Sequence, residues 1–120
     1  MSRPTLAAIS PVDSRYANQT SALSDFYSEY ALFKFRVRIE VEYLIILCDQ
    51  GLQRIGALSE DEVSKLRGLY MDFTLQDAEQ IKKIERTTNH DVKAVEYFVK
   101  SQLEKLGRHD ILEFVHFGLT

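Results

Sequence analysis

Between Phe33 and Leu44 the sequence FKFRVRIEVEYL alternates apolar residues with charged ones. Taken locally, this alternation indicates a β-strand with one buried face. Two observations favour a helix instead. The twelve residues of the stretch exceed the usual strand length of about 5–6. In addition, Arg36 with Glu40 and Arg38 with Glu42 have the i,i+4 spacing that brings side chains together only on a helix.

A helix over this stretch would carry two neighbouring apolar rows and would be buried on most sides. The first row is Phe33, Val37, Val41, Leu44, Ile45 and Cys48, and the second is Phe35, Ile39, Tyr43 and Ile46. The pattern alone leaves helix and strand about equally open. Gly51, which suits the C-terminal end of a helix, moves the prediction slightly toward helix.

Two further helices are indicated by capping signals followed by apolar residues at helical spacing. Ser59 and Glu62 form a capping box at the start of the first of these helices. Thr74 can cap the second. The apolar positions that follow are Val63, Leu66, Leu69 and Tyr70 in the first helix and Leu75, Ala78, Ile81 and Ile84 in the second.

A third helix follows the apolar positions Val92, Val95, Val99, Leu103 and Leu106 and ends at Gly107. Asn89 or Asp91 stands at its start as a natural N-cap. The apolar stretch Ile111–Phe117 then begins another helix. The segment Met1–Ser24 contains both prolines and few apolar residues, so we expect it to be extended or turn-like with no core of its own. The sequence therefore predicts an all-α or mostly α domain.

The composition limits the classes of protein that the chain can represent. Its 120 residues are 45% hydrophobic, with seven Phe and six Tyr, which is enough to bury a core and excludes general disorder. A formal charge of −3 lacks the basic surplus of a general nucleic-acid binder. Cys48 is the single cysteine, and no apolar run approaches the roughly 20 residues that span a bilayer. We expect a soluble cytoplasmic protein.

The first candidate site is the segment Ser10–Tyr16, within the irregular beginning of the chain. Arg15 offers a planar set of donors that suits a phosphate or a carboxylate, and Tyr16 adds a hydroxyl group beside it. The alternative is a surface turn in which Arg15 pairs with Asp13.

The second candidate site is Asn89–His90–Asp91, immediately before the third helix. Free backbone N–H groups at a helix start favour anions. His90 can carry a proton near neutral pH, and Asp91 is close enough in sequence to influence its tautomer. The alternative is simple capping by Asn89 or Asp91, with His90 exposed.

The end of the chain holds a third polar cluster. His116 lies in an apolar stretch, where a core histidine is more common than a catalytic one, and Thr120 could be an N-cap or a ligand. We expect no metal site, because His90, His109 and His116 lack the i,i+4 pairing of a helical zinc site and no cysteine pair supports them.

Four motifs together carry a family resemblance: SPVDSRY, KFRVRIEVEYL, ERTTNHDVKAVEYF and EFVHFGLT. As a set they resemble the amino-terminal part of the adenylosuccinate lyase family, within the fumarase/aspartase superfamily. The similarity runs from about Ile9 to Thr120. It implies an all-α fold and a helix over Phe33–Leu44. Ser14 stands where the family often has Gly, so we expect a minor change of that turn.

The resemblance also implies a reaction and a set of site residues. Members of the family eliminate fumarate from adenylosuccinate, giving AMP, and from SAICAR, giving AICAR, without a metal or an organic cofactor. Arg15 and Tyr16 would then contact the nucleotide at its phosphate end. Asn89, His90 and Asp91 would line the substrate pocket, with His90 assisting the chemistry or orienting the substrate. Thr120 would bind the succinyl portion.

Parts that the family needs are missing from this sequence. The general acid is a His further along, and the general base is a Ser on a loop with an SSxMPxKxN-like stretch, which does not occur here. Family members are homotetramers with sites built from three subunits. We therefore expect residues 1–112 to form an amino-terminal helical domain and residues 113–120 to begin a central helical domain that is truncated. The chain alone would be inactive.

Two other interpretations stay open. The chain could belong to a sister lyase of the argininosuccinate lyase or fumarase type, although the Asn89–Asp91 sequence argues against this. It could also be a non-catalytic helical interaction module in which each polar cluster is a cap or an ion pair.

Overall fold

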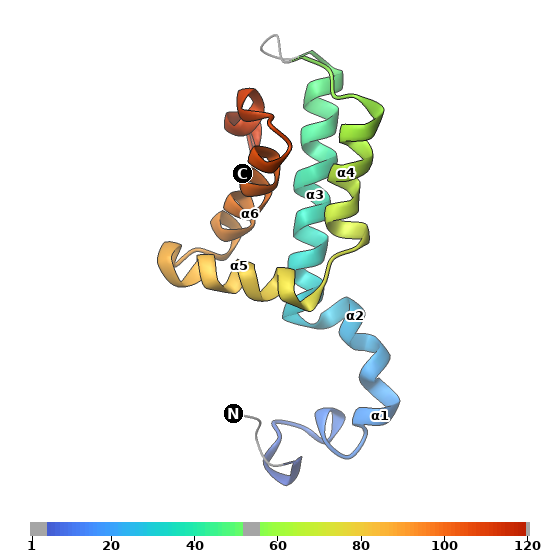
Figure 1. Ribbon diagram of the computed structural model, residues 1–120. Helices are drawn as coiled ribbons and strands as arrows, with labels where there is room; N and C mark the ends of the chain where they lie inside the picture. Colours follow the sequence, from blue (N-terminus) through green and yellow to red (C-terminus); the bar gives the residue numbers. More distant parts are fainter. Residues whose placement is uncertain (1–4, 52–55, 120) are drawn as a thin grey trace. The chain divides into compact units, whose positions relative to one another are not determined.

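The computed structural model describes residues 5–51 and 56–119, and these residues form helices and turns without a strand. The protein is all-α, as the sequence predicts (Figure 1). The chain divides into two compact units, one up to Leu32 and one from Phe33 onward. The boundary expected at residues 112/113 stays a prediction.

The amino-terminal unit consists of short helical turns (Figure 1). They are the 3-10 helices η1 (Thr5–Ala7), η2 (Pro11–Asp13) and η3 (Ser21–Leu23) and the α-helices α1 (Ala17–Thr20) and α2 (Ser24–Tyr27). Of the two conformations expected for the start of the chain, extended or turn-like, the described residues adopt the turn-like one, because local caps close these turns. Ser10 and Asp13, for example, form a capping box around η2. None of these turns contains a buried residue, so the described part of Met1–Ser24 has no core of its own, as expected.

The stretch with the ambiguous alternation lies within one helix, α3 (Glu29–Asp49). The first apolar row is largely buried: Phe33, Val37, Val41, Leu44 and Cys48 are at most 2% exposed. The second row is not, since Ile39 and Ile46 are each 56% exposed. The expectation that the helix is buried on most sides was therefore wrong for the described chain. Gly51 follows the helix with a φ of 66°, the conformation that its role as a stop requires.

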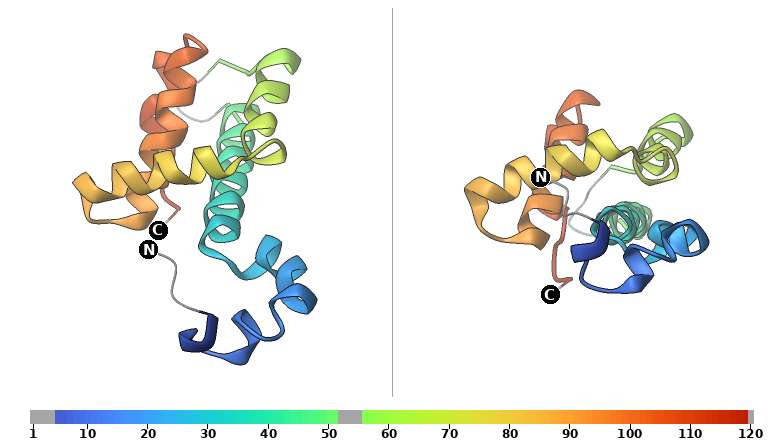
Figure 2. Two further views of the ribbon diagram at one scale, coloured as in Figure 1. Left: turned by 60° about the horizontal axis from the view of Figure 1, so that its bottom comes forward. Right: turned by 90° about the horizontal axis from the view of Figure 1, so that it is seen from below.

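Four more elements complete the second unit: α4 (Glu60–Met71), α5 (Leu75–Thr88), α6 (Asp91–Lys105) and the 3-10 helix η5 (His109–Phe114). α4 runs alongside α3, and α5 crosses near one end of this pair before the chain returns along α6 (Figures 1 and 2). The core lies between these helices. It includes Leu66, Ile81, Val95, Phe98, Val99, Leu103 and Ile111, each at most 1% exposed.

The capping predictions are mostly confirmed. Ser59 with Glu62 and Thr74 with Asp77 form complete capping boxes at the starts of α4 and α5. Gly107 ends the α6 region with a φ of 77°. The N-cap of α6, however, is His90 rather than Asn89 or Asp91.

The helix expected over Ile111–Phe117 is present only in part. A 3-10 helix ends at Phe114, and turns follow it. His116 and Gly118 have φ values of 66° and 69°, which are incompatible with a right-handed helix. The Tyr43 hydroxyl group of α3 donates to the Phe117 carbonyl oxygen at 2.5 Å. This segment is therefore anchored by a contact with a distant helix.

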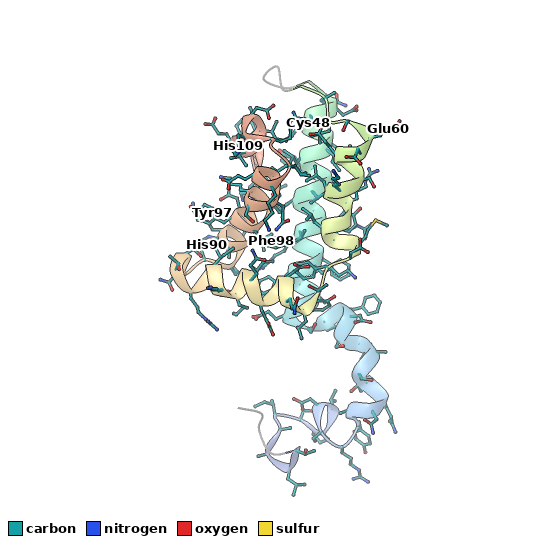
Figure 3. All side chains as sticks on the ribbon, in the orientation of Figure 1. Cys48, Glu60, His90, Tyr97, Phe98 and His109 are labelled. Carbon is teal, nitrogen blue, oxygen red and sulfur yellow. The ribbon has the colours of Figure 1, made fainter. Side chains whose placement is uncertain are left out.

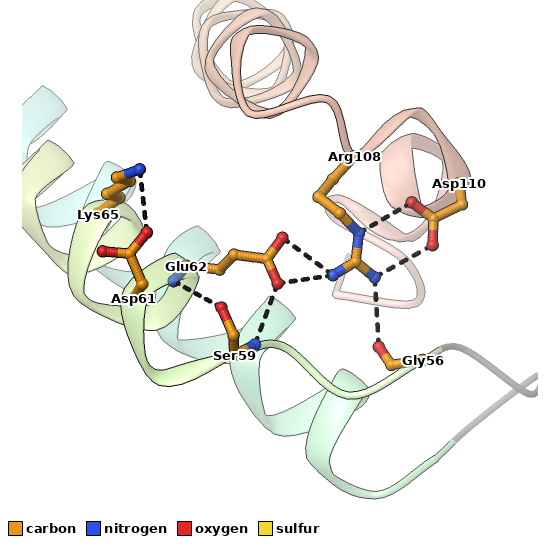
Figure 4. A network of polar contacts seen from close by, with 7 residues as sticks. All are labelled: Gly56, Ser59, Asp61, Glu62, Lys65, Arg108 and Asp110. Carbon is orange, nitrogen blue, oxygen red and sulfur yellow. Dashed lines mark hydrogen bonds and ion pairs between the residues drawn. The ribbon is translucent and has the colours of Figure 1, made fainter.

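Arg108 joins three separate parts of the second unit (Figure 4). Its guanidinium donates to both carboxylate oxygens of Glu62 at 3.0 and 3.1 Å and to the Gly56 carbonyl oxygen at 3.3 Å. It also forms a two-point contact with Asp110. These bonds fix the start of α4 against the turn that follows α6.

Candidate functional site

The turn between α5 and α6 presents the Asn89–His90–Asp91 segment. Asn89 ends α5 in the left-handed conformation, with a φ of 53°, which asparagine tolerates better than most residues. The Thr88 hydroxyl group donates to the His90 carbonyl oxygen at 3.1 Å and accepts from the His90 N–H at 3.3 Å. The turn is therefore held by its own side chains.

His90 begins α6 and is exposed (Figure 3). Its Nδ1 accepts a hydrogen bond from the backbone N–H of Lys93 at 3.2 Å. An accepting Nδ1 has no proton, so the neutral ring carries its proton on Nε2. Capping therefore does not prevent a role in a site, because the cap fixes the tautomer of a ring whose other nitrogen can donate.

Asp91 contacts α3 rather than His90. Its Oδ2 lies 2.7 Å from Nη1 of Arg36, and its Oδ1 accepts from the Val92 N–H at 2.9 Å. The Arg36 hydrogen bond lowers the pKa of Asp91, and the Val92 N–H adds to this effect against the opposing effect of burial. The carboxylate anchors the start of α6, and the Lys93 N–H instead sets the tautomer of His90.

His116 is held by a buried carboxylate of α3. Its Nδ1 lies 2.5 Å from Oε1 of Glu40. Glu40 is 3% exposed, and its Oε2 has no hydrogen-bond partner within the described chain. The sequence left the role of His116 open, with a core histidine more common than a catalytic one, and it indicated Glu40 only as an i,i+4 partner of Arg36. A signal was available, because Glu40 falls between Val37 and Leu44 on the row that the helix buries.

His90 and His116 line the same pocket. It measures about 380 Å³, and its other lining residues are Val92, Lys93 and Glu96. The structure therefore brings together two imidazoles, an ammonium group and a carboxylate, although the two histidines are far apart in sequence. This set of groups can bind an anionic ligand and can donate or accept protons near neutral pH.

Arg15 and Tyr16 belong to the amino-terminal unit. The Arg15 guanidinium lies 5.6 Å from the centroid of the Tyr16 ring, and Tyr16 is 41% exposed. A pocket of about 460 Å³ in this unit is lined by residues between Val12 and Ser28 but by neither Arg15 nor Tyr16. The joint action of these two residues with Asn89–Asp91 stays a prediction.

The remaining expectations have limited structural counterparts. Thr120 lies outside the described residues. Within residues 5–51 and 56–119, no set of three or more His, Cys, Asp or Glu side chains is arranged to hold a metal ion. No helix in this part of the chain has the length and apolar character that crossing a membrane requires.

The sequence is similar to several proteins, each of which is named adenylosuccinate lyase. An adenylosuccinate lyase of Dictyostelium discoideum is 49% identical over 119 residues, which covers 96% of this chain and 26% of that protein. Adenylosuccinate lyases of Escherichia coli K12 and Legionella pneumophila are 44% and 38% identical over 122 residues, covering the whole chain and 27% of each relative. No protein-family model matches the chain. The chain spans about a quarter of the length of these curated relatives.

Proposed function

Because the relatives of this chain are adenylosuccinate lyases along its whole length, we propose that it is the amino-terminal part of such a C–N lyase. In that role it contributes to the elimination of fumarate from adenylosuccinate and from SAICAR. The observation that carries the proposal is the 49% identity across 96% of the chain. The pocket lined by His90, Lys93 and His116 supports it, because these side chains can bind anionic groups and the substrate carries a phosphate and two carboxylates.

The proposal gives the α5–α6 turn the task of holding part of the substrate. His90 would donate from Nε2 to a substrate oxygen, since its Nδ1 is occupied by the Lys93 N–H. Lys93 adds a positive charge to the same pocket. Asn89 and Asp91 would complete this wall. Arg15 and Tyr16 would contact the phosphate, and Thr120 the succinyl portion. No cofactor takes part.

His90 variants in the full-length protein test the chemical part of the proposal. His90→Asn keeps a side chain that can cap α6 but removes the proton-carrying ring, whereas His90→Ala removes both. We expect both variants to lower kcat/KM for adenylosuccinate by about 10²- to 10⁴-fold, as the loss of a proton-transfer group does. Only the alanine variant should also lose stability, by about 0.5–2 kcal/mol.

The absorbance change on fumarate release gives the rates, and urea unfolding gives the stability.

Arg15→Ala should weaken transition-state binding by about 1.5–3 kcal/mol, the value of a hydrogen bond to a charged group. Unchanged turnover in all three variants would favour a non-catalytic helical module. Turnover of argininosuccinate or fumarate in place of adenylosuccinate by the unaltered protein would favour a sister lyase.

The 120-residue chain alone should release no fumarate. If the chain works as the family it resembles does, the general acid and the general base lie on segments outside this sequence, and elimination needs both groups in one site. Measurable turnover by the isolated chain would contradict this part of the proposal. Assembly of the full-length protein into a homotetramer and a cytoplasmic location belong to the same proposal.

A further inference from the structure

We propose that Glu40 is a positioning residue, whose buried carboxylate holds the His116 ring in the wall of the pocket that His90 shares. The effect of this positioning on catalysis rests on the proposed lyase function. The contact itself is a property of the chain: Oε1 of Glu40 lies 2.5 Å from Nδ1 of His116, across 76 residues of sequence.

The burial of Glu40 is the first argument. The residue is 3% exposed, and Val37, Val41 and Leu44 around it on α3 are fully buried. A carboxylate in such surroundings is costly unless it is well paired, and Oε2 of Glu40 has no partner within the described residues. Apolar residues in place of a buried ion pair are often neutral or stabilising. Stability alone therefore does not explain a glutamate at this position.

The backbone of the opposing segment is the second argument. His116 has a φ of 66°, a left-handed conformation that costs energy for a residue other than glycine. The segment is fixed at two neighbouring points on α3, because Tyr43, three residues after Glu40, donates to the carbonyl oxygen of Phe117. Glu40 and Tyr43 together hold a strained turn in one orientation. Strain that the surroundings maintain in this way is typical of functional sites.

The chemistry of the contact is the third argument. A carboxylate that accepts from Nδ1–H keeps a proton on that nitrogen and so selects one tautomer of the ring. His90, in the same pocket, has the opposite arrangement, because its Nδ1 accepts from a backbone N–H. Lys93 and Glu96 of α6 line the same pocket, and Tyr43 of α3 contacts Phe117, the residue next to His116. Glu40 therefore makes the two imidazoles of the pocket chemically different.

The ring-nitrogen signature of His116 tests the positioning, with ¹⁵N NMR of the histidine-labelled chain at a pH where the ring is neutral. The unaltered chain should show the proton on Nδ1. Glu40→Leu should shift the signal toward protonation on Nε2, whereas Glu40→Gln, which retains an acceptor oxygen, should largely preserve the Nδ1–H signature. Glu42→Leu is the matched control, since Glu42 lies on α3 but contacts Arg67 and Tyr70, and it should leave the His116 signal unchanged.

The same variants of the full-length protein test the consequence for catalysis. Glu40→Leu should lower kcat by about tenfold to a hundredfold, the effect of a small misplacement in a site, with a smaller change in KM and partial recovery in Glu40→Gln. Because Glu40→Leu leaves the His116 ring without its acceptor, its urea midpoint should fall, so kcat is compared on protein that circular dichroism shows to be folded, which separates positioning from folding. An unchanged NMR signature or an unchanged kcat in Glu40→Leu would overturn the inference. Absence of adenylosuccinate turnover in the unaltered protein would instead refute the proposed function, and the NMR result would stand.

Discussion

The guanidinium of Arg108 connects three segments of the chain through its hydrogen bonds. It bonds to Glu62 of α4, to Asp110 of η5 and to the Gly56 carbonyl oxygen (Figure 4), and its side chain is only 17% exposed. Partly buried, charge-assisted bonds of this kind are stronger than surface ion pairs. Glu62 serves two roles, because the same carboxylate also completes the capping box with Ser59.

We expect Arg108→Met to lower the free energy of unfolding by about 1–3 kcal/mol, since the substitution removes the charged donor of the partly buried Glu62 carboxylate. Urea unfolding followed by circular dichroism measures the change. Lys65→Met is the matched control, because the Lys65–Asp61 pair is 58% and 74% exposed, and exposed pairs contribute about 0–1 kcal/mol. Equal effects of the two substitutions would show that Arg108 is an ordinary surface residue.

Partner choice at the residue scale could not be predicted from spacing. The i,i+4 pairs Arg36–Glu40 and Arg38–Glu42 favoured a helix, and the helix is correct. In the fold, however, Arg36 contacts Asp91, Glu40 contacts His116 and Glu42 contacts Arg67. Local spacing shows which pairs can meet, but a partner from another helix can offer better geometry. The polar turn at Asn89–Asp91 could be found from the sequence. The contact between Glu40 and His116 could not, because it forms only in the folded chain.

At the scale of single elements, α3 shows why its sequence pattern is ambiguous. An alternation of apolar and charged residues places apolar side chains on several faces of a helix, and only one of these faces is buried here. Val37 and Leu44 are fully buried, whereas Ile39 and Ile46 are each 56% exposed. A strand would instead bury Val37 and Ile39 on the same side.

A pair of substitutions on α3 separates the two faces. Leu44→Ala should lower the free energy of unfolding by about 2–5 kcal/mol, the usual cost of a cavity in a core. Ile46→Ala, two residues further on, should cost less than about 1 kcal/mol because much of its surface is already in water. Chemical unfolding of both variants gives the values. A larger loss for Ile46→Ala than for Leu44→Ala would contradict the orientation of α3.

Helix starts could be predicted well, since a capping box is complete within four residues. Ser59 and Thr74 were identified in this way. The N-cap of α6 was not, because His90 is an unusual cap and Asn89 was needed to end α5 with a positive φ. The turn at His116 was missed for another reason: its anchors, Glu40 and Tyr43, are more than seventy residues away in sequence.

At the scale of the whole second unit, carboxylates and arginines connect the helices. Glu42 pairs with Arg67, Glu62 with Arg108, and Asp91 with Arg36, and each pair joins two separate segments of the chain. Hydrogen bonds from Arg67 lower the pKa of Glu42, and the backbone N–H of Ser59 and then Arg108 lower that of Glu62. Arg36 has the same effect on Asp91.

The stability of this unit should therefore fall in acid. A carboxylate whose pKa is lower in the folded state than in the unfolded chain contributes stability above the ordinary values of 4.5 for Glu and 3.8 for Asp. This contribution is lost as the pH falls through the folded-state pKa, because the unfolded chain then binds more protons. The urea midpoint should be steady between pH 7 and pH 5 and decline below about pH 4. Arg36→Met and Arg67→Met should flatten this decline, and a midpoint that rises in acid would contradict the argument.

The reactivity of the buried Cys48 thiol can be used to follow local opening of the second unit. Cys48 is the single cysteine in the sequence, it is 2% exposed, and burial raises the pKa of its thiol, an effect that the nearby Arg108 partly opposes. Since the thiolate attacks a sulfur of a disulfide reagent, labelling of this buried thiol requires that the end of α3 separates from its neighbours. The rate at which an aromatic disulfide releases its coloured thiol therefore reports how often this part of the unit opens. Arg108→Met removes the contacts to Gly56, Glu62 and Asp110 and should increase that rate.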